Sequence, residues 1–228
     1  MDNIRIIYKD EAIVVIDKPY GMPSQEDRTG DASVLTVLSE MLKERGESAE
    51  LYPVHRLDRG VGGLMAIART KSACAELNLL IQEGRLHKEY LAVAFGHCDG
   101  GAYTDYLFKD AATNKSYAVR TKRQGSRLAS LDAAPLAYSK IAEREATLVR
   151  VVIHTGRHHQ IRAQLSSRGY PLVGDRKYGG VCAQARNIAL LSHRLSFTLY
   201  GREFDFKLLP RTDAFPFSLF EKELKNCE

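Results

Sequence analysis

Residues Val54 to Arg69 read V-H-R-L-D-R-G-V-G-G-L-M-A-I-A-R, a charged segment that runs through glycines into an apolar strand beginning at Leu64. Asp58 stands between Arg56 and Arg59 in this segment. A nearby opposite charge lowers the pKa of a carboxyl, so we expect Asp58 to be ionised and able to act as an oxygen nucleophile. The alternative is that Asp58 caps a turn and that its arginines form surface ion pairs.

The composition is that of an ordinary globular protein, with 44% hydrophobic and 27% charged residues among 228. We expect a single domain over residues 1–228. No stretch approaches the roughly 20 apolar residues that a membrane span needs, and the N-terminus lacks the features of a secretory signal. The cysteines at 74, 98, 182 and 227 show no zinc-site spacing, so we expect reduced thiols, no metal and a cytoplasmic protein.

The positive charge is concentrated in two stretches without acidic residues. Residues 111–131 contain five basic side chains and residues 146–174 contain four arginines, within a chain of net charge +5. Such stretches, interleaved with tyrosines and histidines, are typical of proteins that bind the phosphates of nucleic acids. A solvated loop is the alternative for the first stretch.

Local patterns predict an α+β protein. Alternating and β-branched runs predict antiparallel strands at 4–8, 12–16, 64–68, 87–95, 136–143, 147–153 and 188–200. Apolar spacing and caps predict helices at 34–46, begun by Asp31 or Ser33, and at 71–83, begun by Thr70. Residues 100–130 show only short strand-like runs. We therefore expect a mixed, mostly antiparallel sheet flanked by a few helices.

A further helix is predicted over residues 158–168, ended by Gly169. Its spacing places Arg162 on the inward face, between Ile161 and Leu165. A buried guanidinium needs a carboxylate partner, and we expect that partner to be Asp58. The alternative is that Arg162 extends to the surface with its aliphatic stem packed.

Three segments together resemble the RluA-type RNA pseudouridine synthases. They are H-R-L-D with G-L-M-A-I-A at 55–68, K-E-Y-L-A-V at 88–93, and T-G-R-H-H-Q-I-R-A-Q-L at 155–165 with G-Y-P-L-V-G-D-R-K-Y-G at 169–179. The opening V-V-I-D-K-P-Y-G at 14–21 is similar to the family's N-terminal signature. The resemblance covers nearly the whole chain and implies a pseudouridine-synthase fold with a central catalytic cleft. It also implies a member without the small N-terminal RNA-binding module that many members carry.

The resemblance assigns roles to individual residues. Asp58 matches the catalytic aspartate, Tyr90 the tyrosine that packs on the base, and Arg162 the arginine paired with the aspartate. Arg56 resembles the arginine that fills the gap left by the flipped base, and Leu191 the apolar wall of the pocket. His55 and Arg157 belong to the same motifs and are assigned to substrate binding.

The implied activity is isomerisation of uridine to pseudouridine in ribosomal or transfer RNA, without metal or cofactor, by a cytoplasmic monomer. The target base is first extruded from its helix. The motif fits an aspartate that adds to the uracil ring, attacks C1′, or helps remove the C2′ proton.

The chain departs from the family pattern at several positions. It has Val61-Gly62 where the family usually has Thr-Ser, His158 where it has Thr, Gln164 where it has His, and Ser192-His193 where it has His-Ala. Two other functions are alternatives to pseudouridine formation. One is an RNA-binding protein that has lost its activity, and the other is a metal-dependent hydrolase built on His154, His158 and His159.

Overall fold

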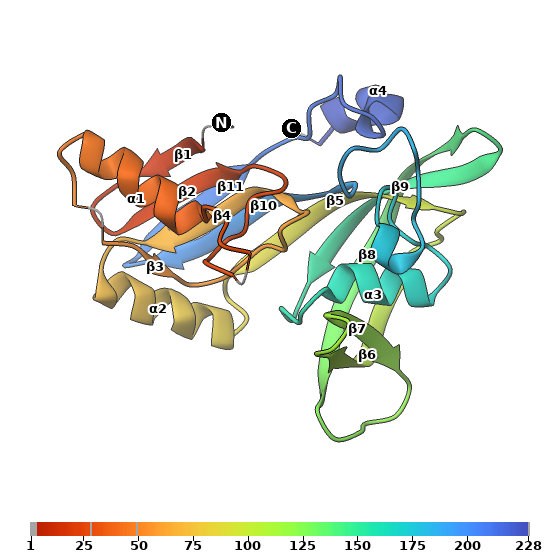
Figure 1. Cartoon of the computed structure of the whole chain (residues 1–228), viewed down its shortest axis with the longest axis horizontal. Coiled ribbons are helices and arrows are strands. Elements are labelled where there is room, and N and C mark those ends of the chain that lie inside the picture. Colours follow the sequence, from red (N-terminus) through yellow and green to blue (C-terminus); the bar gives the residue numbers. More distant parts are fainter. Residues whose placement is uncertain (1–3, 28, 49, 228) are drawn as a thin grey trace. The chain divides into compact units, whose positions relative to one another are not determined.

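Two compact units make up the chain, residues 1–87 with 192–208 and residues 88–191 with 209–228. The structure is a computed structural model that describes residues 4–27, 29–48 and 50–227 (Figure 1). The boundary between the units falls inside a strand, at Ser192. The expectation of a single domain over 1–228 stays a prediction, and each unit is described by itself.

The first unit is built on an antiparallel hairpin at its N-terminus. Strands β1 (Arg5–Lys9) and β2 (Ile13–Lys18) pair as the sequence predicts, because Asp10 accepts hydrogen bonds from the main-chain N–H groups of Ala12 and Ile13 and so closes the turn. The strand order continues through β4 (Gly62–Ala68) to β10 (Leu190–Leu199). Strand β3 (Tyr52–Pro53) pairs with β4, and β11 (Arg202–Lys207) forms an antiparallel hairpin with β10.

Two helices lie on either side of these strands (Figure 1). Helix α1 (Val34–Glu44) begins at Ser33, whose hydroxyl accepts from the N–H of Thr36, and α2 (Lys71–Gln82) begins at Thr70 in the same way. Both helices and both caps were predicted. Helix α2 packs its apolar stripe on the strands, and the cluster contains Ala73, Leu77 and Leu80 with Ile13, Val15, Leu64, Ala66, Leu195 and Phe197.

The second unit is an antiparallel sheet in the order β5-β9-β8-β6-β7. Its strands are β5 (His87–Phe95), β6 (Gly101–Asp110), β7 (Lys115–Val119), β8 (Ser126–Ile141) and β9 (Arg144–Ile153). The predicted turn around residues 144–146 is wrong by a few residues, because the chain reverses at Ala142, which takes a left-handed φ of 51°. Strand β8 is also longer than predicted, since its first half pairs with β6.

Helix α3 (Gln160–Ser167) and the short helix η1 (Arg176–Tyr178) cover one face of this sheet. The predicted start of α3 at His158 is wrong, because His159 takes a left-handed φ of 52° that precedes the helix. The C-terminal segment forms η2 (Phe217–Phe220) and α4 (Glu221–Lys225). The α+β class is confirmed.

Two further observations concern the chain as described. All four cysteines are free thiols. Among residues 4–27, 29–48 and 50–227, no helix combines the length and the apolar character that crossing a membrane requires.

Candidate active site

The loop that carries Asp58, residues 55–61 and called the Asp58 loop below, is held by its main chain. Ser24, which is buried, donates from its hydroxyl to the carbonyl of Leu57 at 2.8 Å and accepts from the N–H of Leu57 at 3.1 Å. The N–H of Gly21 donates to the carbonyl of Arg59 at 2.8 Å. The residues on both sides of Asp58 are therefore anchored to the segment at 21–24. The sequence reading did not single out Ser24.

A buried lysine lies beside this loop. Lys18, at the end of β2, is fully buried and donates from Nζ to the carbonyls of Pro19 at 2.9 Å and Arg59 at 3.4 Å. Burial lowers the pKa of Lys18 to about 8, and the negative charge of Asp58 acts in the opposite direction. At neutral pH the ammonium group is still charged. The sequence analysis did not identify this cation beside Asp58. The signal for it was a lysine at the end of a largely apolar strand.

The other charged residues of the Asp58 loop have different surroundings. Arg59 donates from Nε to the carbonyl of Gly21 at 2.8 Å and forms an ion pair with Asp31. Its guanidinium is therefore bound to the segment before α1. Arg56 is exposed, which suits its predicted contact with substrate. His55 accepts from the N–H of Ala66 at 3.0 Å through Nε2 and joins the start of the loop to β4.

Two glycines at the end of the loop permit close packing. A Cβ at Gly63 would lie 2.4 Å from the carbonyl oxygen of Ser192, and Gly63 has a positive φ of 106°. A Cβ at Gly62 would lie 2.8 Å from the ring of Tyr20. Glycine at position 62 therefore suits its surroundings, because Tyr20 occupies the space that a side chain there would need.

In the second unit Arg162 is buried, as predicted, and has a carboxylate partner. Its Nε and Nη2 donate to the two oxygens of Asp175 at 2.6 and 3.0 Å, and the two residues are 6% and 1% exposed. Such a bidentate pair fixes the guanidinium plane. Asp175 lies within the motif at 169–179, but the sequence analysis gave it no role. The predicted pairing of Arg162 with Asp58 would join the two units and stays a prediction.

Aromatic and histidine side chains surround this ion pair. The ring of Tyr178 lies 5.0 Å from the Arg162 guanidinium, and its hydroxyl is 3.0 Å from Nδ1 of His159. Burial, with the positive charge of Arg162 as the next cause, lowers the pKa of His159 to about 2, so the imidazole is neutral. His158 stacks on His159 and contacts the hydroxyl of Ser116 at 2.9 Å through Nδ1.

The segment before α3 is tied to β8 by a side chain that the sequence reading missed. Gln160 accepts from the Thr155 hydroxyl at 2.7 Å and from the N–H of Arg157 at 3.0 Å, and it donates to the carbonyl of Ser130 at 2.9 Å. The Arg157 side chain donates from Nε to the carbonyl of Leu128 at 2.9 Å. This contact orients Arg157 on the sheet, and its predicted role in substrate binding stays a prediction.

Tyr90 and Leu191 are both buried in the second unit. Tyr90 is on β5, opposite Val151 of β9, and is 6% exposed. Leu191, at the start of β10, is 4% exposed. The predicted catalytic cleft, which would bring these residues to Asp58, stays a prediction.

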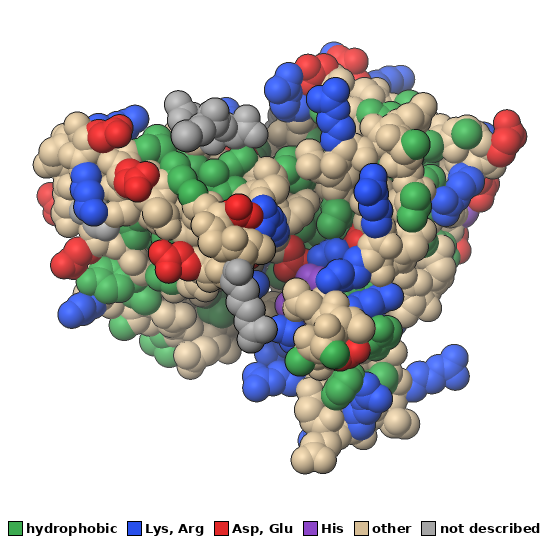
Figure 2. Space-filling model, in the orientation of Figure 1, with side chains coloured by type: hydrophobic (Ala, Val, Ile, Leu, Met, Phe, Trp, Pro, Cys, Tyr) green, Lys and Arg blue, Asp and Glu red, His purple; other side chains and the backbone are tan. Residues whose placement is uncertain are grey.

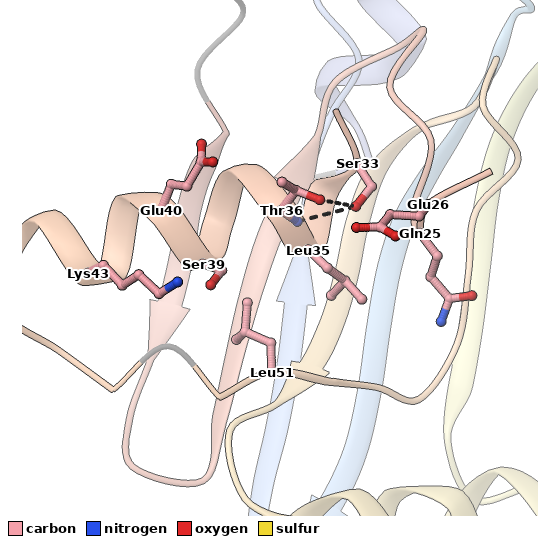
Figure 3. Close-up of a pocket in the computed structure, with 9 residues that line it drawn as sticks. All are labelled: Gln25, Glu26, Ser33, Leu35, Thr36, Ser39, Glu40, Lys43 and Leu51. Atoms are coloured by element: carbon pink, nitrogen blue, oxygen red, sulfur yellow. Dashed lines mark hydrogen bonds between the residues drawn. The ribbon is translucent and has the colours of Figure 1, made fainter. Parts of the chain in front are cut away.

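A polar pocket of about 540 Å³ lies beside α1 (Figure 3). Its lining includes Ser33, Thr36, Glu40, Lys43 and Leu51, and the Ser33 hydroxyl at its edge accepts from the N–H of Thr36 at 3.2 Å. None of the predicted site residues lines this pocket. We therefore assign it no catalytic role.

The histidines of the hydrolase alternative have separate partners. His154 is exposed and lies 2.7 Å from Asp132, whereas His158 and His159 contact Ser116 and Tyr178. In the described part of the chain, no group of three or more His, Cys, Asp or Glu side chains is placed to hold a metal ion. This geometry does not support a metal site at these histidines.

Comparison with known proteins identifies the family. A family model described as RNA pseudouridylate synthase matches residues 12–167, which include Asp58, Tyr90 and Arg162. The chain belongs to the RNA pseudouridylate synthase family. The RluA-type resemblance is confirmed by relatives such as the ribosomal large subunit pseudouridine synthase D of Vibrio parahaemolyticus, which is 34% identical over 77% of this chain and 52% of its own length. The tRNA pseudouridine synthase C of Pasteurella multocida is 29% identical over 84% of this chain and 79% of its own.

The solved structures agree on the fold of this pseudouridylate synthase family member. Human RNA Pseudouridylate Synthase Domain Containing 4 superposes with a TM-score of 0.75 at 22% identity, over 97% of this chain and 93% of that chain. The predicted pseudouridine-synthase fold is thereby confirmed. The chain spans little more than half the length of several curated relatives that it matches, including the Vibrio protein.

Two remaining departures from the family pattern have structural partners. Gln164 donates to Asp105 at 2.7 Å and to the carbonyl of Tyr103 at 3.3 Å, which fastens α3 to β6. His193 contacts the carbonyl of Leu208 at 2.8 Å through Nδ1. Both side chains therefore stabilise the frame that carries the site.

Proposed function

We propose that this chain isomerises uridine to pseudouridine in RNA, with Asp58 as the nucleophile. In this reaction the bond between N1 and C1′ breaks and a bond between C5 and C1′ forms, while the proton on C5 leaves and N1 gains one. The product has the same atoms as the substrate. The proposal therefore includes no metal, redox cofactor or co-substrate.

The arrangement of the Asp58 loop carries this proposal. A nucleophile must be held in place, and hydrogen bonds to the main chain of Leu57 and Arg59 fix the residues on both sides of Asp58. The buried ammonium of Lys18 places a positive charge near Asp58.

The other site residues take roles around the flipped base. Tyr90 stacks on the extruded uracil, and Leu191 forms the apolar wall of its pocket. Arg162, whose guanidinium plane Asp175 orients, approaches Asp58 in the complete site. Arg56 fills the gap left in the RNA, with His55 and Arg157 as further substrate contacts.

The substrate is ribosomal or transfer RNA. Among the relatives, one is named for the large ribosomal subunit and another for tRNA, and the two stretches rich in Lys and Arg suit either polyanion. We place the reaction in the cytoplasm and the enzyme as a monomer.

Mapping pseudouridine in RNA from a strain that lacks this gene tests the proposal. At least one site should lose its modification in the deletion strain and regain it with the wild-type gene. The variant Asp58→Asn should restore none, because activity falls on the order of a thousandfold or more when a nucleophile is removed. Adding purified protein to RNA from the deletion strain tests direct action.

The alternative, RNA binding without catalysis, gives a different result. It predicts that purified wild-type protein and Asp58→Asn bind RNA equally and that neither converts uridine. A deletion strain with every site still modified, combined with no conversion by purified protein, would reject the enzyme assignment.

A further inference from the structure

Strands β6, β7 and β8 carry apolar side chains on both faces, and only one of these faces packs against α3. Leu107 lies opposite Ala118 and Arg127 in register, and Leu107 and Ala118 pack toward α3 and Tyr178. Neighbouring residues of a strand point to opposite faces. The opposite face, called the outer face below, therefore carries a different set of side chains, which are Tyr106, Phe108, Tyr117, Val119 and Leu128.

The outer face is open to solvent. Tyr117 is 41% exposed and Leu128 47% exposed, and Tyr106, Phe108 and Val119 are partly exposed. Phe108 lies directly opposite Tyr117, and Tyr106 lies directly opposite both Val119 and Leu128, so these side chains are contiguous. Contiguous exposed apolar side chains of this kind mark interaction sites.

Cations border this face. Residues 111–131 contain Lys115, Arg120, Lys122, Arg123 and Arg127 and no acidic residue, and Arg127, opposite Leu107, is on the α3 side. The guanidinium of Arg123 lies 3.6 Å from the centre of the Phe108 ring. Nζ of Lys115 lies 5.2 Å from the centre of the Tyr117 ring and 4.9 Å from that of Tyr178, so Lys115 is at the edge between the two faces. Across the described residues, none of these five side chains forms an ion pair with a carboxylate. Figure 2 shows Lys and Arg side chains gathered around the part of the molecule that β6 and β7 form.

We propose that the outer face binds a single-stranded segment of the substrate RNA. Exposed bases stack on aromatic rings, while guanidinium and ammonium groups beside the rings contact phosphates. A duplex offers phosphates but keeps its base faces stacked inside, so it cannot use Tyr106, Phe108 and Tyr117. A second copy of this chain is a poorer occupant, because the chain has a net charge of +5 and would bring like charges together.

The outer face serves nucleotides other than the target. Tyr90 lies opposite Val151, which lies opposite Ala133, and Ala133 shares its face of β8 with the buried Ala129. Tyr90 is therefore on the α3 side of the sheet, away from the outer face. Strand β7 is the last strand in the order, so an RNA strand can pass round this edge from one face to the other, beside Lys115 and Arg120. This inference rests on RNA as the substrate and extends the proposed function to the flanking sequence.

Fluorescence anisotropy with the full chain tests the inference. The probes are a fluorescein-labelled 12-nucleotide oligouridine and a labelled 12-base-pair RNA duplex at one fixed salt concentration. Tyr117→Ala should weaken oligouridine binding by about 5- to 100-fold, the effect of losing one stacking ring, and should leave duplex binding nearly unchanged. Tyr117→Phe should bind like the wild type. The matched control is Tyr138→Ala, which removes an equally exposed tyrosine that lies elsewhere on β8.

A second variant separates stacking from charge. Arg123→Gln should weaken binding and reduce the slope of log affinity against log salt by about one. Unchanged oligouridine affinity in Tyr117→Ala, or equal losses for oligouridine and duplex, would overturn the inference. So would a dimer in sedimentation that Leu128→Ser abolishes. Because these assays measure binding alone, they can fail while pseudouridine formation by the wild type still stands, and the reverse also holds.

Discussion

The Asp58 loop and the α3 segment each carry a catalytic candidate, but they hold it by different means. The Asp58 loop is anchored through main-chain groups by Ser24 and Gly21 and passes close to its neighbours at Gly62 and Gly63. On α3 the candidate side chain itself is held, because Arg162 forms a buried bidentate ion pair with Asp175. The main chain around Asp58 is therefore fixed by the segment at 21–24, whereas the guanidinium plane of Arg162 is fixed by a side chain.

Loss of the buried ion pair between Arg162 and Asp175 should give the largest fall in stability. Asp175→Ala leaves the Arg162 guanidinium buried without its partner, which should lower the free energy of unfolding by about 3–5 kcal/mol in urea titrations. The control is Asp205→Ala, which removes a similar bidentate pair with Arg194 at the surface and should cost about 1 kcal/mol or less. Equal losses in the two variants would show that the buried Arg162–Asp175 pair stabilises the fold no more than a surface ion pair does.

A side chain added at Gly63, just after the Asp58 loop, should give the next largest fall in stability. Gly63→Ala combines a positive φ with a Cβ 2.4 Å from the Ser192 carbonyl, and we expect a loss of about 2–3 kcal/mol with reduced activity. Gly84→Ala is the matched control, since Gly84 has a φ of 72° and nothing within 4 Å of the added Cβ. That variant should lose only about 1 kcal/mol. Similar losses would mean that backbone strain alone, without close packing, explains Gly63.

The hydroxyl of Ser24 should have a smaller effect on stability and a distinct effect on rate. Ser24→Ala leaves buried main-chain groups of Leu57 without their partner, at a cost of about 1–2 kcal/mol. Because the hydroxyl orients the residue before Asp58, kcat should fall with little change in KM. Ser24→Thr keeps a hydroxyl and should restore most of the rate. A fall in stability with unchanged kcat would assign Ser24 a purely structural role.

The pH dependence of the α3 segment should give an effect on stability of about the same size as the Ser24 substitution. The pKa of His159 is lowered to about 2 in the folded chain, so the unfolded chain binds a proton there at higher pH than the folded chain does. The stability that the neutral imidazole contributes is present above about pH 6.5 and is lost as the pH falls, by up to about 1.4 kcal/mol per pH unit.

Urea unfolding at pH 7 and pH 5 measures this loss. His159→Asn, which tolerates the left-handed backbone, should narrow the difference in stability between the two pH values. An unaltered difference in His159→Asn would mean that other groups cause the acid sensitivity.

Much of the fold followed from local patterns. The hairpin of β1 and β2, the caps at Ser33 and Thr70, and the strand around Tyr90 were all predicted, because each depends on residues within a few positions. The start of α3 was missed, because a histidine in a left-handed conformation leaves no pattern in the sequence. Strands in residues 100–130 were read poorly, because β6 and β7 carry apolar or aromatic side chains on both faces and so lack the alternation of a half-buried strand.

The candidate site also combines residues that the sequence predicted with residues that it did not. The amino-acid sequence alone singled out the candidates for the chemistry, since Asp58, Tyr90 and Arg162 stand in motifs whose order and spacing are readable along the chain. Only the tertiary structure decided what supports them. Ser24 reaches Leu57 across 33 positions, and Asp175 reaches Arg162 across 13. Such partners are chosen by packing, because a buried polar group takes the nearest complementary group in space, whatever its distance along the chain.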